Sequence, residues 1–498
     1  MLPLAEVRSR FGFVICCIAG VSLPFAFAPF NVWLVAPLAL AALFVMLSGT
    51  SPRQAFIRAL VFGFSSFLVG AYWIFISVSV FYGAPAALGI AATVGLALLL
   101  ASFFAVVVSL VARFVTLSGV VGAHVVLPAA WVLAEWLRSW LFTGFGWLSA
   151  GYSQTDTWLM SFAPMLGLLG VSYAVALTAG ALASTLSVPA STRRTAAMLV
   201  VAVWGIAWIF SGWRWTSPRP SLVNVAIAQA AIDQDRKWLP EQYQPTLDIY
   251  RELSLRAGGR DLIVWPEVAV PNLYEYARDY LQIVQQEVAQ DGATLVTGIL
   301  QRQDDGAQLN SVVAMTASPQ FFAKRHLVPF GEYIPLPRFM LTWLGNLGIP
   351  YPDIGAGESD QALLAVAGEQ LSVSICYEDV FGAEQRDFLP AASLIVNVAN
   401  DAWFGRSIAA EQHLQIARLR AAEAGRYVLR ATNTGVSAVI DPLGNVVERG
   451  PSYEPALLQA TVQGFEGSTP YVRFGDAPVV LISLVLLSAA VFREKRRG

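Results

Sequence analysis

A single cysteine, Cys376, is the candidate nucleophile in the polar part of the chain. The other two, Cys16 and Cys17, lie in a charge-free apolar stretch, where packing is the expected role. Residues 371–379 alternate like a strand that delivers Cys376 at its end, before a predicted helix over 380–388. A thiol at a helix N-terminus gains positive potential, so we predict a lowered pKa for Cys376. The following amide N–H can donate to an oxyanion.

Two further residues fit the same chemistry. Glu267 follows the apolar run 262–265 and a proline, which places a carboxylate at the end of a predicted strand, where α/β sites usually assemble. The chain has three lysines and 29 arginines, and the polar domain keeps only Lys237 and Lys324. Arginine can replace lysine at a solvated surface, but not where a compact ammonium must meet one oxygen. Lys324, in an apolar stretch, is therefore a candidate for such a contact. A thiol that attacks a carbonyl group needs a base for its proton and a cation aimed at the developing oxyanion, and Glu267 and Lys324 are groups of these two kinds.

Short apolar runs that alternate with amphipathic stretches indicate that an α/β domain positions these residues. Helices are predicted at 240–256, 273–290 and 408–425, and a turn at 441–445. Strands are predicted at Val223–Ala228, Leu262–Trp265, Thr294–Ile299, Val312–Thr316, Leu371–Ile375, Ser393–Val398 and Val436–Ile440.

The rest of the chain predicts an integral membrane protein. Apolar residues make up 56% and charged residues 13% of the 498, against about 25% charged in soluble domains. This composition excludes a soluble globular protein, a disordered chain and a disulfide-stapled secreted module. Crossing a bilayer takes ~20 residues. The charge-free stretches predict eight spans: two in 11–52, two in 59–112, and one each at 114–134, 157–187, 195–213 and 477–492.

Charge is distributed unevenly among three predicted parts. The seven-helix domain 1–212 carries +5, the α/β domain 213–477 carries −10, and the last helix with its basic tail, 478–498, carries +3. Cytoplasmic loops carry an excess of Lys and Arg. We therefore predict that both termini are cytoplasmic and that the α/β domain faces outward, into the periplasm of a Gram-negative bacterium. Glu135 and Arg138, on the fifth predicted span, are expected to pair on one helix face.

Three motifs together resemble the Glu–Lys–Cys triad of the nitrilase, or carbon–nitrogen hydrolase, superfamily. They are Trp265-Pro266-Glu267, Lys324 with the segment 327–332, and Cys376-Tyr377-Glu378. With the predicted spans around that domain, the whole chain resembles the apolipoprotein N-acyltransferase family. The resemblance implies an integral membrane fold with eight transmembrane α-helices and an outward-facing nitrilase-like α-β-β-α sandwich.

The resemblance also implies residue roles. Cys376 would be the nucleophile, Glu267 the general base, and Lys324 the oxyanion stabiliser, aided by the Tyr377 N–H. The matching supporting positions are Glu332, Tyr377 and Glu378, and Trp238 matches a loop tryptophan near the active site. A further family-like segment, to which we assign no role, contains Asn397, Asp401, Trp403 and Phe404.

The implied reaction is the last step of bacterial lipoprotein maturation, in the cell inner membrane. A fatty acyl chain would move from a phospholipid, at sn-1 of phosphatidylethanolamine, through a Cys376 thioester. The acceptor would be the α-amino group of the N-terminal S-diacylglyceryl-cysteine of an apolipoprotein. The expected partners are these two substrates and the bilayer, with the protein a monomer. No cofactor, metal or nucleic acid is expected, because the histidines lack ligand spacing and no basic face or Gly-rich phosphate loop occurs.

The segment 333–352 is nearly uncharged and contains four Pro and two Gly. We predict a mobile lid over the site, the alternative being a buried loop. The side chains predicted to contact lipid or acyl chains are Phe339, Leu341, Trp343 and Leu344.

Two other functions remain open from the sequence. A membrane-tethered amidase or nitrilase would use the same triad with water as the second nucleophile, although a single anchor helix would suffice for it. A transporter or receptor with an inactive outer domain would more often carry several charges within its spans.

Overall fold

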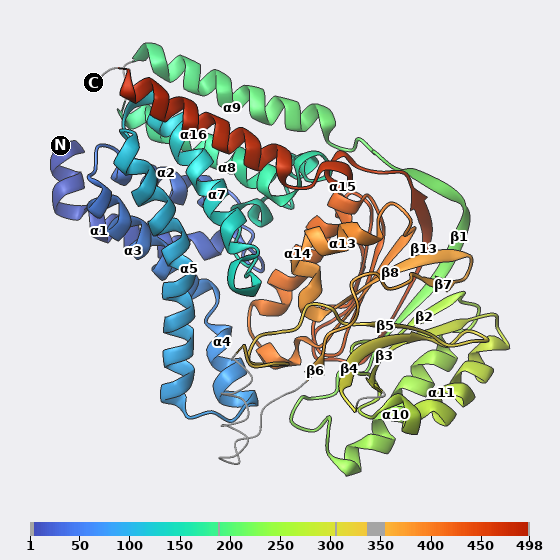
Figure 1. The fold of residues 1–498 in the computed structure, drawn as a ribbon. Helices are drawn as coiled ribbons and strands as arrows, with labels where there is room; N and C mark the ends of the chain where they lie inside the picture. Colours follow the sequence, from blue (N-terminus) through green and yellow to red (C-terminus); the bar gives the residue numbers. More distant parts are fainter. Residues whose placement is uncertain (1–3, 188–189, 304–305, 336–353, 497–498) are drawn as a thin grey trace. The chain divides into compact units, whose positions relative to one another are not determined.

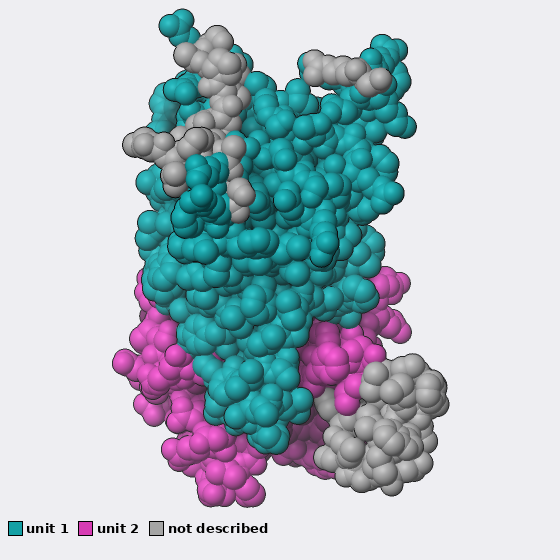
Figure 2. All heavy atoms as spheres, turned by 90° about the vertical axis from the view of Figure 1, so that its left-hand side faces the viewer, with its two compact units in different colours: residues 1–213, 407–423, 469–498 teal, residues 214–406, 424–468 magenta. Residues whose placement is uncertain are grey.

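The computed structural model describes residues 4–187, 190–303, 306–335 and 354–496 (Figure 1). The chain divides into two compact units, coloured separately in Figure 2. Unit 1 contains Met1–Trp213, Ser407–Glu423 and Thr469–Gly498, and unit 2 contains Arg214–Arg406 and Ala424–Ser468. Helix α14 (Ala409–Ala424), which lies in the polar half of the sequence, therefore belongs almost entirely to unit 1.

Unit 1 is built mainly from apolar helices. They are α1 (Leu4–Ser22), α2 (Val35–Leu47), α3 (Pro52–Gly70), α4 (Trp73–Ile76), α5 (Ala86–Phe114), α6 (Gly119–Val121), α7 (Leu127–Arg138), α8 (Ala163–Ser187), α9 (Ala190–Phe210), α15 (Pro470–Phe474) and α16 (Ala477–Lys495). Within the described ranges, five stretches are long and apolar enough to cross a membrane: Ala86–Phe114, Gly119–Arg138, Trp158–Thr185, Arg193–Phe210 and Ala477–Lys495. The bent pair Pro52–Gly70 and Trp73–Phe81 makes up to six. The first apolar helices, Arg10–Ala26 and Val35–Leu47, are shorter, so the count of eight spans stays a prediction.

The two charges of α7 fix the loop that follows this helix. Glu135 Oε1 accepts hydrogen bonds from Trp131 Nε1 (2.8 Å) and from the N–H of Ala150 (2.7 Å). The guanidinium of Arg138 donates to the carbonyl of Trp147 (2.7 Å) and to Ser149 Oγ (2.8 Å). These buried charges therefore hold the loop in place, and the ion pair predicted between them stays a prediction.

Unit 2 contains two β-sheets. The seven-stranded sheet has the order β13-β1-β2-β3-β4-β5, with β6 beside β4, and the six-stranded sheet has the order β12-β11-β10-β9-β8-β7. The first sheet comprises β1 (Ser217–Gln229), β2 (Leu262–Val264), β3 (Thr294–Arg302), β4 (Gln308–Ala314), β5 (Gln320–Ala323), β6 (Ile354–Gly355) and β13 (Ala456–Glu466). The second comprises β7 (Leu364–Val366), β8 (Glu369–Ile375), β9 (Leu394–Ala399), β10 (Val428–Thr432), β11 (Ala438–Ile440) and β12 (Val446–Arg449).

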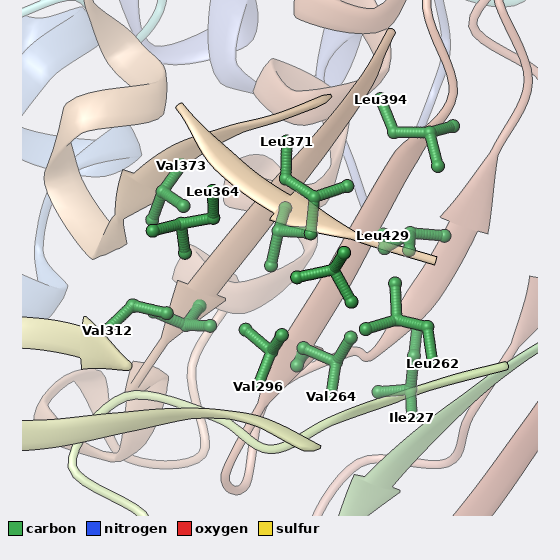
Figure 3. Close-up of a cluster of buried hydrophobic side chains, with 14 of the residues drawn as sticks. Ile227, Leu262, Val264, Val296, Val312, Leu364, Leu371, Val373, Leu394 and Leu429 are labelled. Carbon is green, nitrogen blue, oxygen red and sulfur yellow. The ribbon is translucent and has the colours of Figure 1, made fainter. Parts of the chain in front are cut away.

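The sheets pack face to face through a buried apolar core. Figure 3 shows Ile227, Val264 and Val296 of the first sheet close to Leu371 and Leu429 of the second. Neighbouring residues on the same strands point the other way, because side chains alternate along a strand. There they pack against α10 (Pro240–Arg256) and α11 (Tyr274–Ala289). Three successive layers of the predicted nitrilase-like sandwich, α, β and β, thus lie within unit 2.

Parallel pairing places the predicted site residues at strand ends. β1 pairs in parallel with β2, and β2 with β3. In the second sheet, β8 pairs in parallel with β9, and β9 with β10. Glu267 follows β2 and Cys376 follows β8, so each lies at the carboxyl end of a parallel strand, as the sequence predicts.

Candidate active site

Cys376 occupies a sharp turn directly after β8. It begins the five-residue 3-10 helix η7 (Cys376–Val380), and its φ of 55° lies in the left-handed region. A side chain with Cβ rarely adopts this conformation, which costs of order 1–3 kcal/mol and is concentrated at functional sites. The prediction of one continuous helix over 380–388 is wrong, because the structure has two short helices there, α13 (Gly382–Gln385) and η8 (Arg386–Phe388).

The Cys376 thiol is buried among charged groups. Burial raises its pKa well above the usual value, and the negative charge of Glu267 raises it further. The charge of Lys324 and the backbone N–H of Asn400 oppose this effect without overcoming it. The prediction of a lowered thiol pKa is therefore wrong, because desolvation outweighs what a single 3-10 turn can supply. The resting side chain is a thiol, and its use as a nucleophile requires a base.

Glu267 is a buried carboxylate with one oxygen engaged. Its Oε1 accepts a hydrogen bond of 2.7 Å from Asn310 Nδ2, whereas no partner of Oε2 is found within the described ranges. A Cβ at Gly298 of β3 would lie 2.6 Å from the Glu267 Cα, so glycine is needed for the two segments to approach. The close packing holds the candidate base in place and leaves one oxygen to accept a proton.

Lys324 follows β5 and is almost completely buried, with 1% of its surface exposed. Its Nζ lies 2.7 Å from Glu332 Oε1, and Asn310 Nδ2 donates to the same oxygen at 3.3 Å. Burial disfavours the ammonium, but the charges of Glu332, Glu267 and Cys376 outweigh that effect and raise the lysine pKa. Lys324 is therefore a permanent cation, joined to Glu267 through Glu332 and Asn310. Asn310, a buried polar residue on β4, was not predicted.

Glu378 links the cysteine turn to the lysine segment. Its Oε2 accepts from the N–H of Ile375 (2.7 Å), and its Oε1 accepts from the N–H groups of Arg325 (2.6 Å) and His326 (3.0 Å). The residues before Cys376 and after Lys324 are thereby held together by one carboxylate. The Tyr377 ring packs edge-on against His326, with ring centroids 5.7 Å apart.

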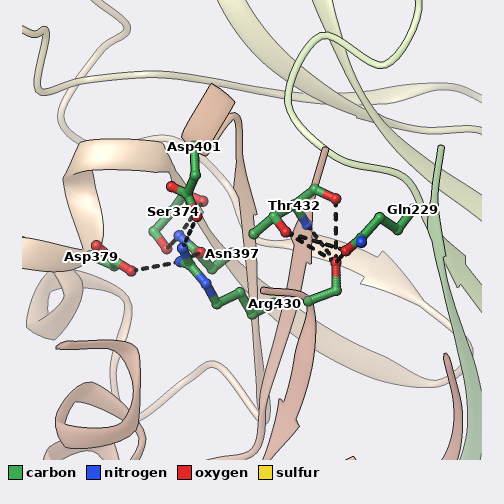
Figure 4. A network of polar contacts seen from close by, with 8 residues as sticks. Gln229, Ser374, Asp379, Asn397, Asp401, Arg430 and Thr432 are labelled. Atoms are coloured by element: carbon green, nitrogen blue, oxygen red, sulfur yellow. Dashed lines mark hydrogen bonds and ion pairs between the residues drawn. The ribbon is translucent and has the colours of Figure 1, made fainter. Parts of the chain in front are cut away.

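A buried arginine ties together the segments on both sides of the cysteine (Figure 4). Arg430, on β10, forms ion pairs with Asp379 (3.2 Å) and Asp401 (2.9 Å) and donates to Asn397 Oδ1. Asn397 in turn donates to Ser374 Oγ at 3.0 Å. Arg430, which was not predicted, therefore binds the family-like segment through Asn397 and Asp401.

A second buried lysine lies at the site. Lys237 is 3% exposed and donates to the carbonyl oxygen of Glu267 at 3.2 Å. Its neighbour Trp238 is 52% exposed, and its predicted place beside the substrate stays a prediction. The four predicted lid residues, Phe339, Leu341, Trp343 and Leu344, lie outside the described residues. Within the described part of the chain, no group of three or more His, Cys, Asp or Glu residues is arranged to hold a metal ion.

Known proteins match both parts of the chain. Residues 19–181 match the family model described as the apolipoprotein N-acyltransferase N-terminal domain, and residues 224–471 match the carbon-nitrogen hydrolase model. The apolipoprotein N-acyltransferase of Methylococcus capsulatus is 40% identical over 485 residues, covering 96% of this chain and 95% of that protein. The one from Nitrosomonas europaea is 42% identical over 487 residues, covering 96% and 97%. Among solved structures, an amidase from Nesterenkonia sp. AN1 matches with 18% identity and a TM-score of 0.39, covering 53% of this chain and 97% of that one.

Proposed function

The chain belongs to the apolipoprotein N-acyltransferase family, and from this premise we propose how it transfers an acyl group. The protein is a membrane N-acyltransferase whose acceptor is a lipoprotein. The proposed donor is a phospholipid, with phosphatidylethanolamine giving its sn-1 chain. The proposed acceptor group is the α-amino group of an N-terminal S-diacylglyceryl-cysteine.

In the first half-reaction, the Cys376 thiol loses its proton to Glu267 as sulfur attacks the donor's ester carbonyl. Lys324 and the Tyr377 N–H stabilise the tetrahedral oxyanion, and a donor aimed at such an oxygen is worth about 10²–10³-fold in rate. The ester C–O bond then breaks, and the leaving oxygen takes the proton back from Glu267. A lysophospholipid departs, and the acyl chain remains on Cys376 as a thioester.

In the second half-reaction, the α-amino group attacks the thioester carbon. An α-amino group has a pKa of about 7.7–8.0, so part of it is neutral and nucleophilic near pH 7. Glu267 accepts the proton that the nitrogen loses as the C–N bond forms. The C–S bond breaks, the proton returns to sulfur, and the products are an amide and the free thiol.

One observation carries this proposal most directly. The thiol of Cys376 has a raised pKa, and the nearby carboxylate of Glu267 keeps one oxygen without a hydrogen-bond partner among the described residues. The buried thiol needs a base, and the buried Glu267 carboxylate has an oxygen without a described hydrogen-bond partner. Together these two features support proton transfer from Cys376 to Glu267. General base catalysis of this kind typically contributes about 10²–10⁴-fold.

The test is to incubate the purified full-length protein with phosphatidylethanolamine and no acceptor, and to measure its intact mass and its modified peptides. A hydroxylamine-labile acyl group on the Cys376 peptide, absent from Cys376→Ser, is the expected result. Free fatty acid without a persistent adduct would instead support a hydrolase that uses water. The absence of both an acyl adduct and released fatty acid would overturn the assignment of the donor or of the nucleophile.

The membrane arrangement is part of the same proposal. Eight spans, with the division at residues 212/213 and 477/478, would place both termini in the cytoplasm and the catalytic domain in the periplasm, anchored in the inner membrane as a monomer. The cluster of basic residues in the last turn of α16 and directly after it supports a cytoplasmic C-terminus. Alkaline phosphatase fused after residue 498 should be inactive, and the same enzyme inserted near residue 306 should be active. The opposite pattern would overturn the orientation.

A further inference from the structure

Among the residues that the structure describes, no carboxylate forms an ion pair with the buried ammonium of Lys237. Within the same ranges, its one hydrogen bond goes to the backbone carbonyl oxygen of Glu267, at 3.2 Å. An ammonium carries three N–H donors, and only 3% of the residue is exposed. A buried charge is costly unless it is paired. The position therefore holds a cation at a cost in stability, which indicates a role beyond packing.

The two lysines of the site differ in how their charges are balanced. Lys324 is paired with Glu332 at 2.7 Å, so part of its positive charge is already neutralised in the resting enzyme. For Lys237, the two charged groups that act on it, Glu267 and Cys376, are the proposed base and the nucleophile. Burial lowers the pKa of Lys237 to about 8, even though both of these groups oppose that shift.

We propose that Lys237 is a positioning residue of the acyl-transfer site, which fixes the Glu267 backbone and supplies uncommitted positive charge to the Cys376 thiolate. This role rests on the proposed functions of Cys376 and Glu267. When the thiol proton moves to Glu267, a negative charge appears on sulfur. Lys237 and Cys376 interact electrostatically, and a nearby positive charge favours the ionised form of a thiol.

The test measures the thiolate directly, without lipid. Full-length protein is treated with iodoacetamide across pH 6.5–10, and the fraction of alkylated Cys376 peptide is followed by mass spectrometry. Lys237→Met removes the charge and keeps a side chain of similar length. Lys237→Arg keeps the charge at all of these pH values. Arg236→Met removes an exposed charge one residue away and serves as the matched control.

We expect Lys237→Met to alkylate Cys376 about tenfold more slowly at pH 7.5 and to shift the alkylation profile upward by about one pH unit. Acyl-enzyme formation from phosphatidylethanolamine should slow by a similar factor, with little change in KM. Arg236→Met should match the wild type in both assays. An unshifted profile in folded Lys237→Met protein, or an equal shift in Arg236→Met, would overturn the proposal.

Lys237→Arg keeps the proposal testable if Lys237→Met does not fold. Above about pH 8 the wild-type lysine loses its proton, whereas arginine does not. Lys237→Arg should therefore alkylate Cys376 faster than the wild type above pH 8 and similarly below pH 7. Identical profiles throughout would count against the role of the charge. Failure of the proposed function would appear separately, as the absence of an acyl adduct on Cys376 in the wild-type protein.

Discussion

Asn310 and Glu267 are joined by a hydrogen bond of 2.7 Å, from the amide nitrogen of one to the carboxylate of the other. The bond engages Oε1 and leaves Oε2 without a partner among the described residues. The same amide nitrogen also reaches Glu332 Oε1 at 3.3 Å. Asn310 therefore determines which oxygen of the candidate base is available, and at the same time joins that base to the partner of Lys324.

Replacing Asn310 by alanine should slow acyl-enzyme formation by about 10–100-fold, a part of the ~10²–10⁴-fold that a positioned base supplies. Without Asn310, the Glu267 carboxylate can rotate and its Oε1 loses its hydrogen bond. The measurement is single-turnover acylation of Cys376 by phosphatidylethanolamine. Gln308→Ala, an exposed position on the same strand, is the control and should change nothing. An unaffected rate in Asn310→Ala would mean that Glu267 needs no such support.

Replacing Glu267 by glutamine should change acylation and alkylation in opposite directions. Burial first, and then the charge of Glu267, raise the pKa of the Cys376 thiol. Removing that charge lowers the pKa, so more thiolate is present at a given pH and alkylation by iodoacetamide at pH 8 should become faster. Acyl transfer should fall by about 10²-fold or more, because the base is lost.

The comparison with Glu267→Asp separates the two effects, since that variant keeps the charge but moves the carboxylate. It should slow acylation and leave alkylation close to the wild-type rate. If Glu267→Gln instead alkylates more slowly, the resting state already contains a thiolate and a protonated Glu267.

The site residues that could be predicted from the sequence are those with a distinctive local sequence around them. Cys376 and Glu267 each end an apolar strand-like run, and Lys324 is a rare lysine in an apolar stretch. Asn310 and Arg430 were not predicted, and Lys237 was noted only as a rare lysine without a role. Their partners are distant in sequence: 43 residues separate Asn310 from Glu267, and 30 separate Lys237 from Glu267. The pKa of Cys376 was predicted in the wrong direction for a related reason. The local pattern shows a turn after a strand, whereas the desolvation of sulfur depends on how the whole unit packs.

The place of α14 could not be predicted either, although its helical pattern was. Its polar side chains bind the ends of unit 1 helices: Gln412 donates to the carbonyl of Gly70 (3.2 Å), and Gln415 accepts from the N–H of Ala28 (3.2 Å). Gln415→Ala would leave the buried Ala28 N–H unpaired, which costs about 1–3 kcal/mol. We therefore expect a lower unfolding temperature in detergent. Gln286→Ala, an exposed glutamine on α11, should leave that temperature unchanged. Equal melting of both variants would show that this contact contributes nothing to stability.

Arg430 provides the strongest test of how unit 2 supports the cysteine turn. Its guanidinium is fully buried and pairs with Asp379, three residues after Cys376, and with Asp401. The charge of Asp401 also raises the Cys376 pKa, after burial and Glu267. Arg430→Met would remove an ion-pair partner from two buried carboxylates, and breaking a buried pair by removing one partner costs about 3–5 kcal/mol.

We therefore expect Arg430→Met to unfold at a clearly lower temperature and to alkylate Cys376 more slowly, since the charge of Asp401 opposes the thiolate and the variant no longer balances it with the Arg430 charge. Arg430→Lys keeps the charge but has a single point donor in place of a planar fork. It should recover part of the alkylation rate and less of the stability. Arg449→Met, an exposed arginine on β12 of the same sheet, is the matched control for both measurements. If Arg430→Met lowered stability and left the alkylation profile of Cys376 unchanged, the network would support the fold of the turn without setting the charge at the nucleophile.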